Sequence, residues 1–163
     1  MRILLVGVVA LVTVLPRAGG AGVTVALPHG WHAVPQAWLG SAKYTDPVTR
    51  VVIASAPIHW TDTGCQVASY AFSKRAVAIL IVEWRSSYPG TRYPLRPRRF
   101  TSANLKIHPP PALECFDGAG GSIQFADHGR HFGAYVLLGR QAPAALATKA
   151  RAVLDTLRVS PRR

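Results

Sequence analysis

The segment AVAILIVEW, residues Ala76 to Trp84, contains a single charged side chain, Glu83, among nine residues. The other eight residues are apolar, and four of them are β-branched. A short and nearly continuous apolar run of this kind is typical of a β-strand that is covered on both faces. We therefore expect a central strand here. An unpaired carboxylate at its end would be costly, so we expect Glu83 to form an ion pair with Arg85 or with an arginine from the segment that follows. A catalytic acid with a raised pKa is the alternative role.

Other strands are predicted on both sides of this segment from alternating or β-branched residues. The first is Val23 to Leu27, followed by a turn over 28–31, and the second is Arg50 to Ala56. A hairpin is predicted from Gly121–Ala126 and His131–Leu138, joined by the link 127–130, whose Asp and Gly suit a tight turn. Between the second strand and the central one, we expect a loop over 58–64 and a short helix over 66–73.

The C-terminal segment has the pattern of an amphipathic helix that begins at Pro143, a residue favoured in the first turn. Its apolar residues lie at helical spacing on one side; they are Leu146, Ala150, Val153, Leu154 and Leu157. The outer side is polar and carries Lys149, Arg151, Asp155 and Arg158, with Arg151 and Asp155 at i, i+4. The sequence thus predicts an α+β fold, an antiparallel sheet of five or six strands with a C-terminal helix packed on one face.

The N-terminus has the layout of a secretory signal peptide. Arg2 precedes the uncharged, mostly apolar run Ile3–Leu15, and small residues follow at 18–22. We expect a signal peptide over 1–21, a single globular domain over 22–163, and a secreted or extracytoplasmic location. A membrane anchor is the alternative, although a bilayer span needs about 20 apolar residues.

Two cysteines, Cys65 and Cys115, both follow the predicted leader. In an exported protein an even pair of cysteines favours a disulfide. We therefore predict a Cys65–Cys115 bond. Two buried free thiols are the alternative.

The chain is strongly basic, with 19 Lys and Arg against 7 Asp and Glu and a formal charge of +12. The positive charge is densest in the segment 84–113, here called the basic connection, which has six prolines and no acid. Its cations are Arg85, Arg92, Arg96, Arg98, Arg99 and Lys106. Cations interleaved with aromatic residues can bind polyanions. For an exported protein, an anionic cell-surface polymer or lipid headgroups fit better than nucleic acid. A solvated loop is the alternative.

Two turns share the pattern His-Gly-x-His, and their histidines are His29, His32, His128 and His131. Neutral imidazoles can share a metal ion such as Zn, Cu or Ni, and all four could converge if the turns meet; otherwise both are plain strand turns. The glycine-rich stretch 117–122 lacks the Gly-Lys-Ser/Thr ending of a phosphate loop. No Gly-x-Ser-x-Gly elbow occurs. The sequence predicts no cofactor.

Several motifs in this order resemble those of uncharacterised small exported proteins of actinobacteria and related soil bacteria. They are LPHGW, DPVTRVVIASAP, AILIVEW, RPRRF, HGRHFGAYVLLG and ARAVLDTLRV. That resemblance implies no activity. The opening strand with Pro-x-Gly-Trp and the terminal helix are more loosely similar to PsbP/Mog1-like α+β domains, which implies a binding or assembly module.

Taken together, these features favour an exported, non-enzymatic binding domain that recognises an anionic surface or polymer. The first alternative is a small hydrolase or metal-binding protein that uses the histidine turns. The second is a structural or assembly protein that acts through a sheet edge.

Overall fold

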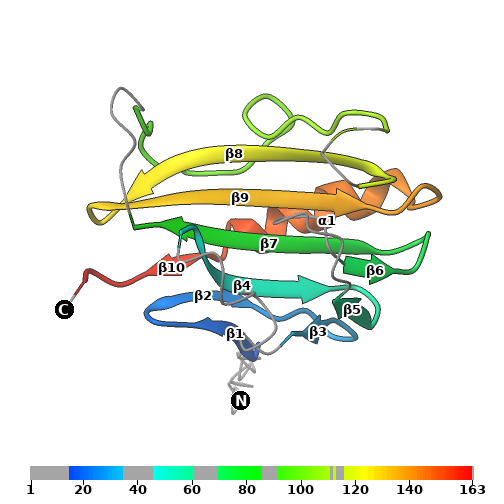
Figure 1. Cartoon of the computed structure of the whole chain (residues 1–163), viewed down its shortest axis with the longest axis horizontal. Helices are drawn as coiled ribbons and strands as arrows, with labels where there is room; N and C mark the ends of the chain where they lie inside the picture. Colours follow the sequence, from blue (N-terminus) through cyan, green and yellow to red (C-terminus); the bar gives the residue numbers. More distant parts are fainter. Residues whose placement is uncertain are drawn as a thin grey trace, which may run out of the picture.

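The computed structural model describes residues 15–34, 46–60, 70–85, 92–110, 112 and 116–162. Its main element is a five-stranded antiparallel sheet. In spatial order the strands are β3 (His32–Ala33), β4 (Val48–Ala54), β7 (Val77–Trp84), β9 (Arg130–Leu138) and β8 (Ala119–Asp127). The helix α1 (Ala144–Leu154) contacts β7 and β9 on one face of this sheet (Figure 1). The predicted α+β architecture, an antiparallel sheet with a C-terminal helix on one face, is confirmed.

Two smaller sheets complete the fold. A three-stranded antiparallel sheet has the order β1 (Arg17–Gly20), β2 (Val23–Ala26) and β10 (Arg158–Val159). Its strands β1 and β2 contact β4, and β2 also contacts α1. A two-stranded antiparallel sheet pairs β5 (Ile58–Trp60) with β6 (Tyr70–Phe72).

Strand β7 is central and buried on both faces, as its apolar run predicts. Val77, Ile79 and Ile81 face the main core, which they share with α1 and the three-stranded sheet. Ala78 and Leu80 face a second, smaller core on the opposite side of the sheet. Because successive side chains of a strand point to opposite faces, an apolar residue at nearly every position is what burial on both faces requires.

The predicted hairpin is confirmed as β8–β9, with Asp127 paired to Arg130. The two residues between them, His128 and Gly129, have φ values of 49° and 69°. Positive φ at both positions is the geometry of a type I′ turn, whose twist matches that of the paired strands. Glycine adopts this conformation without strain.

The helix is confirmed, but it ends before the last residues of the predicted apolar stripe. Ala150, Val153 and Leu154 are buried in it. Leu157 is also buried, although it lies in the turn that leads from the helix to β10. Leu157, the last residue of the stripe, is thus held in the core by a turn and not by the helix.

Arg151 and Asp155, which stand at i, i+4 on the outer side of the predicted helix, both form hydrogen bonds with the basic connection. The Asp155 carboxylate accepts a hydrogen bond of 2.7 Å from the backbone N–H of Phe100. Arg151 donates instead to the carbonyl oxygen of Leu105. Both side chains therefore anchor the basic connection to the helix.

Two local predictions are wrong. The predicted loop over 58–64 begins with strand β5, and the predicted helix over 66–73 contains strand β6. Backbone pairing between the two strands, from Ile58–Phe72 to Trp60–Tyr70, overrides the local pattern. Residues 61–69 lie outside the described part of the chain.

Within the basic connection, the sequence also predicts one edge strand around Phe100 to Ile107, and this prediction is wrong. The described residues 92–110 contain two isolated bridges to β8, Leu95 to Ala126 and His108 to Gly120, and no extended strand. Between these bridges, Phe100 and Leu105 are buried in the main core. The segment therefore covers the edge of β8 and contributes apolar side chains to the core.

The first strand, β1, overlaps the predicted signal peptide. Its residues 17–20 pair with β2, and Arg17 donates hydrogen bonds to Thr24 and to the carbonyl oxygen of Thr156. Cleavage after Ala21 would separate β1 from β2, and the leader itself stays a prediction. Within the described residues, no helix is both long and apolar enough to cross a membrane.

Cys65 and Cys115 both lie outside the described residues. The Cys65–Cys115 disulfide therefore stays a prediction. Titration of denatured, non-reduced protein is expected to find close to zero free thiols per chain, and two reactive thiols would contradict the bond.

Candidate functional site: an arginine pocket around Glu83

Glu83 is the buried charge at the end of the central strand. Its side chain is 1% exposed. It follows Ile79 and Ile81 at every second position of β7 and so points to the main-core face of the sheet. A carboxylate in this position needs hydrogen-bonded cations, and arginines from three different parts of the chain supply them.

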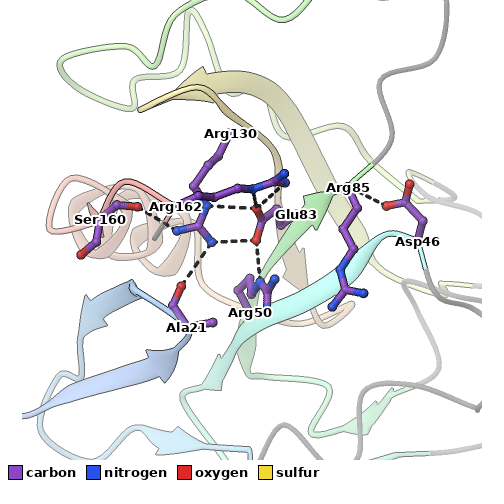
Figure 2. Close-up of polar contacts among 8 residues, drawn as sticks. All are labelled: Ala21, Asp46, Arg50, Glu83, Arg85, Arg130, Ser160 and Arg162. Atoms are coloured by element: carbon purple, nitrogen blue, oxygen red, sulfur yellow. Dashed lines mark hydrogen bonds and ion pairs between the residues drawn. The ribbon is translucent and has the colours of Figure 1, made fainter.

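Arg130, the first residue of β9, forms the most buried of these pairs (Figure 2). Its Nε lies 3.0 Å from Glu83 Oε1 and its Nη2 lies 2.7 Å from Oε2, which is a bidentate contact. The side chain is 4% exposed. The same guanidinium donates to the carbonyl oxygens of Ser160 and Ala21. Arg130 thus joins β7, the β1–β2 turn and the C-terminal segment.

Arg50 reaches the same carboxylate from β4. The register between β4 and β7 shifts between Thr49 and Val51, which makes Arg50 the extra residue of a β-bulge. A bulge changes the direction of a side chain. Here the Arg50 Nε lies 2.7 Å from Glu83 Oε2, and the side chain is 15% exposed.

Arg162 approaches from the C-terminal segment after β10. Its Nη2 lies 3.0 Å from Glu83 Oε1, and its side chain is 55% exposed. Glu83 therefore accepts hydrogen bonds from three arginines at different depths (Figure 2).

These contacts determine the ionisation of Glu83. Burial raises the pKa of the carboxyl, but hydrogen bonds from Arg130, Arg50 and Arg162 and the charge of Arg50 outweigh burial and lower the pKa to about 2. The predicted ion pair is confirmed, although its partners are not the ones expected. The alternative of a catalytic acid with a raised pKa is wrong, because the surrounding cations stabilise the ionised form.

A cavity of about 610 Å³ lies over this ion cluster. It is lined by Ala21, Gly22, Arg50, Glu83, Arg85, Arg130, Ser160, Pro161 and Arg162. Four arginines and one glutamate give the lining a formal charge of +3. We call this cavity the arginine pocket. A concave surface with this excess of guanidinium groups can bind anions.

Arg85, the residue that follows strand β7, also lines the arginine pocket with its side chain. Its backbone N–H donates a hydrogen bond to Asp46 Oδ1 at 2.7 Å (Figure 2). This hydrogen bond ties the end of β7 to the residues just before β4.

Of the six cations predicted to bind anions, all of which are described, Arg85 is the one that lines the arginine pocket. Arg96 has a structural role: its Nε lies 3.0 Å from Asp127 Oδ2, and its Nη1 donates to the carbonyl oxygen of Leu157. Arg92, Arg98, Arg99 and Lys106 are exposed.

The four histidines predicted as metal ligands do not converge. His29 and His32 are exposed near β3. His128 bonds to Asp127 Oδ1 at 2.7 Å, and His131 stacks on Tyr93 at 4.3 Å between ring centroids. Among the residues that the structure describes, no three His, Cys, Asp or Glu side chains form a group that could hold a metal ion. The two turns are built for strand connection.

The sequence did not single out Arg50, Arg130 or Arg162. One signal was present, since a lone acid in a buried strand requires cations on the strands paired with it. The strand register and the bulge that choose those cations were not visible in the sequence.

The chain matches no protein-family model, no curated protein and no solved structure. Its function is therefore argued from the arginine pocket itself.

Proposed function

We propose that this protein is an exported, non-enzymatic domain that binds an anionic group of the cell surface in the arginine pocket. The observation that carries the proposal is the formal charge of +3 in one cavity, from four arginines and one glutamate. The distribution of charge along the chain also favours anion binding, but the arginine pocket is a more specific location than the basic connection.

The arginines divide into a floor and a rim. Arg130 and Glu83 form a buried bidentate pair whose charges cancel, and this pair is the floor. Arg50, Arg85 and Arg162 line the rest of the cavity. Guanidinium groups suit this task because each stays protonated and offers a planar fork of donors to an oxyanion.

The same lining gives hydrolysis little support. General acid–base catalysis works best with a group whose pKa lies near the working pH. Among the described residues, Glu83 is the one acid that lines the cavity, and its pKa is lowered to about 2. No histidine of the described residues lines the cavity.

Assembly through a sheet edge is also less well supported than anion binding. At one edge of the five-stranded sheet, β3 has two residues. At the other edge, β8 is bridged to Leu95 and His108. Short or covered edges are how proteins avoid edge-to-edge pairing.

The proposal includes a secreted location and a PsbP/Mog1-like fold. The apolar run near the N-terminus supports the first, and the antiparallel sheet with a terminal helix on one face supports the second. The partners that fit are an anionic cell-surface polymer or lipid headgroups.

Calorimetric titration with inorganic pyrophosphate tests the pocket. We expect binding that weakens as salt is added, because a cluster of arginines is screened by ions. The variant Arg85→Gln/Arg162→Gln should weaken binding by about tenfold or more, since each tenfold loss corresponds to only about 1.4 kcal/mol.

The matched control is Arg98→Gln/Arg99→Gln, which removes the same charge from exposed positions of the basic connection. It should leave the affinity within about twofold of the wild-type value, the range expected for distant, screened charges. Equal losses in the two variants, or no binding by the wild-type protein, would overturn the proposal. Thermal melts establish that both variants are folded.

A further inference from the structure

We infer that the arginine pocket selects a doubly charged tetrahedral oxyanion, such as the phosphoryl group of a phosphate monoester or inorganic sulfate, over singly charged groups such as a phosphodiester or a carboxylate. This inference rests on the proposed function and specifies its ligand. Three observations support it. They are the net charge of the lining, the burial of its charged side chains, and the hydrogen bonds that its acceptor atoms already accept from arginines.

The charge balance favours two negative charges over one. The described lining residues, four arginines and one glutamate, carry three net positive charges. A singly charged ligand would leave a net charge of +2 in the pocket, whereas a doubly charged ligand leaves +1. Each added negative charge therefore gains attraction from this excess of positive charge.

Burial strengthens this preference. The side chain of Glu83 is 1% exposed, that of Arg130 is 4% exposed and that of Arg50 is 15% exposed. Charges shielded from water interact through a lower effective dielectric than charges on an open surface. The attraction between a ligand and Arg50 is thus stronger than the attraction to an arginine on an open surface.

The acceptor atoms of the lining are already engaged. Both oxygens of Glu83 accept from guanidinium groups, and the carbonyl oxygens of Ala21 and Ser160 accept from Arg130. A ligand that carries a P–OH group would compete for these acceptors. A fully ionised group offers acceptor oxygens only, which complements the guanidinium donors.

Glu83 stays ionised at pH 5 and at pH 8, because its pKa is about 2. Among the residues that the structure describes, no histidine, lysine or tyrosine lines the pocket. His128, on the β8–β9 turn, is bonded to Asp127 and is not one of the lining residues. A change in affinity over this range therefore reports the ionisation of the ligand.

The test is calorimetric titration with methyl phosphate, dimethyl phosphate and sulfate at constant ionic strength, at pH 8 and at pH 5. At pH 8, methyl phosphate should bind about tenfold or more tightly than dimethyl phosphate, because the monoester carries two charges and the diester one. At pH 5, binding of methyl phosphate should weaken by about tenfold, since a second pKa near 6 leaves roughly a tenth of it doubly charged.

Titration with sulfate distinguishes selection by charge from selection of the phosphoryl group. Sulfate is doubly charged at both pH values, so its affinity should not change between them. Equal affinities for sulfate and methyl phosphate at pH 8 would show that charge alone is selected. Sulfate binding that is about tenfold weaker would assign the ligand to phosphoryl groups.

The variant Arg162→Gln should reduce the preference for methyl phosphate over dimethyl phosphate, and the control Arg98→Gln should preserve it. Equal binding of the two phosphate esters, with pyrophosphate binding intact, would overturn the selectivity and leave the proposed function standing. Absence of pyrophosphate binding would instead overturn the proposed function.

Discussion

The arginine pocket and the basic connection both concentrate positive charge, but they place it in different surroundings. In the arginine pocket, three arginines from separate parts of the chain meet around one buried carboxylate, and Arg85 adds a fourth guanidinium to the lining. In the basic connection, the cations are neighbours in sequence, yet Arg98, Arg99 and Lys106 are exposed and Arg96 is paired with Asp127.

The comparison shows that charge density along a chain is a weak guide to a binding site. Exposed cations are screened by water and salt, and each contributes little. Cations gathered in a cavity act on the same small volume. The basic connection serves the fold chiefly through its apolar residues, whereas the arginine pocket depends on its charges. The following predictions test that division of roles.

The largest expected effect is on the ion cluster. Glu83→Gln leaves buried arginines without their counter-charge, and breaking a buried pair in this way costs about 3–5 kcal/mol of unfolding free energy. Urea denaturation at pH 7 measures it. As the control, Asp117→Asn in the exposed Arg140–Asp117 pair should change stability by less than about 0.5 kcal/mol.

The pH dependence of the free energy of unfolding tests the role of Glu83 in a second way. Glu83 has a pKa of about 2 in the folded protein and an ordinary value of 4.5. Because the pKa is lowered in the folded protein, ionised Glu83 contributes about 3 kcal/mol to the free energy of unfolding above pH 4.5. This contribution is lost as the pH falls toward 2. The Glu83→Gln variant should lack this part of the acid destabilisation. Identical acid profiles for variant and wild type would contradict the assigned role of Glu83.

The next largest loss of stability is expected when Leu105, a buried residue of the basic connection, is shortened. Leu105 is fully buried in the main core, so Leu105→Ala should cost about 2–5 kcal/mol. The neighbouring Lys106→Ala, at an exposed position, should cost less than about 0.5 kcal/mol. Chemical denaturation compares them. Equal costs would mean that the connection does not depend on its apolar residues.

A smaller loss is expected when the chain begins at Gly22 rather than at Leu15. The shorter chain lacks β1, the three hydrogen bonds donated by Arg17, and the Ala21 carbonyl that accepts from Arg130. At about 0.5–1 kcal/mol for each of these four hydrogen bonds, three of which are exposed, the free energy of unfolding should fall by about 2–4 kcal/mol. Matching melting curves for the two chains would show that β1 is dispensable and that cleavage after Ala21 is compatible with the fold.

The smallest effect is expected on the exposed cations. Arg98→Gln/Arg99→Gln should change the free energy of unfolding by less than about 0.5 kcal/mol, measured by urea denaturation. A loss above about 1 kcal/mol would show that these side chains support the fold, and the contrast between the two regions would then be wrong.

The sequence by itself was sufficient for elements whose pattern is long and local. The apolar run of β7, the tight turn between β8 and β9 and the stripe of α1 each contain within a few residues the reason for their conformation. The α+β class follows from these elements. Shorter segments were less informative: the residues of β5 and β6 form strands because they pair with each other, and Phe100 and Leu105 are core residues because a sheet edge lies beside them.

Only the tertiary structure decided the arginine pocket. The sequence could show that Glu83 is an isolated acid in an apolar strand and that it needs a cation. It could not show which cations, because Arg50, Arg130 and Arg162 lie 33, 47 and 79 residues from it along the chain. The register of β9, the bulge in β4 and the path of the C-terminal segment after β10 bring them together. Side-chain contacts of this range depend on how whole strands are paired, and no local pattern of residues encodes that pairing.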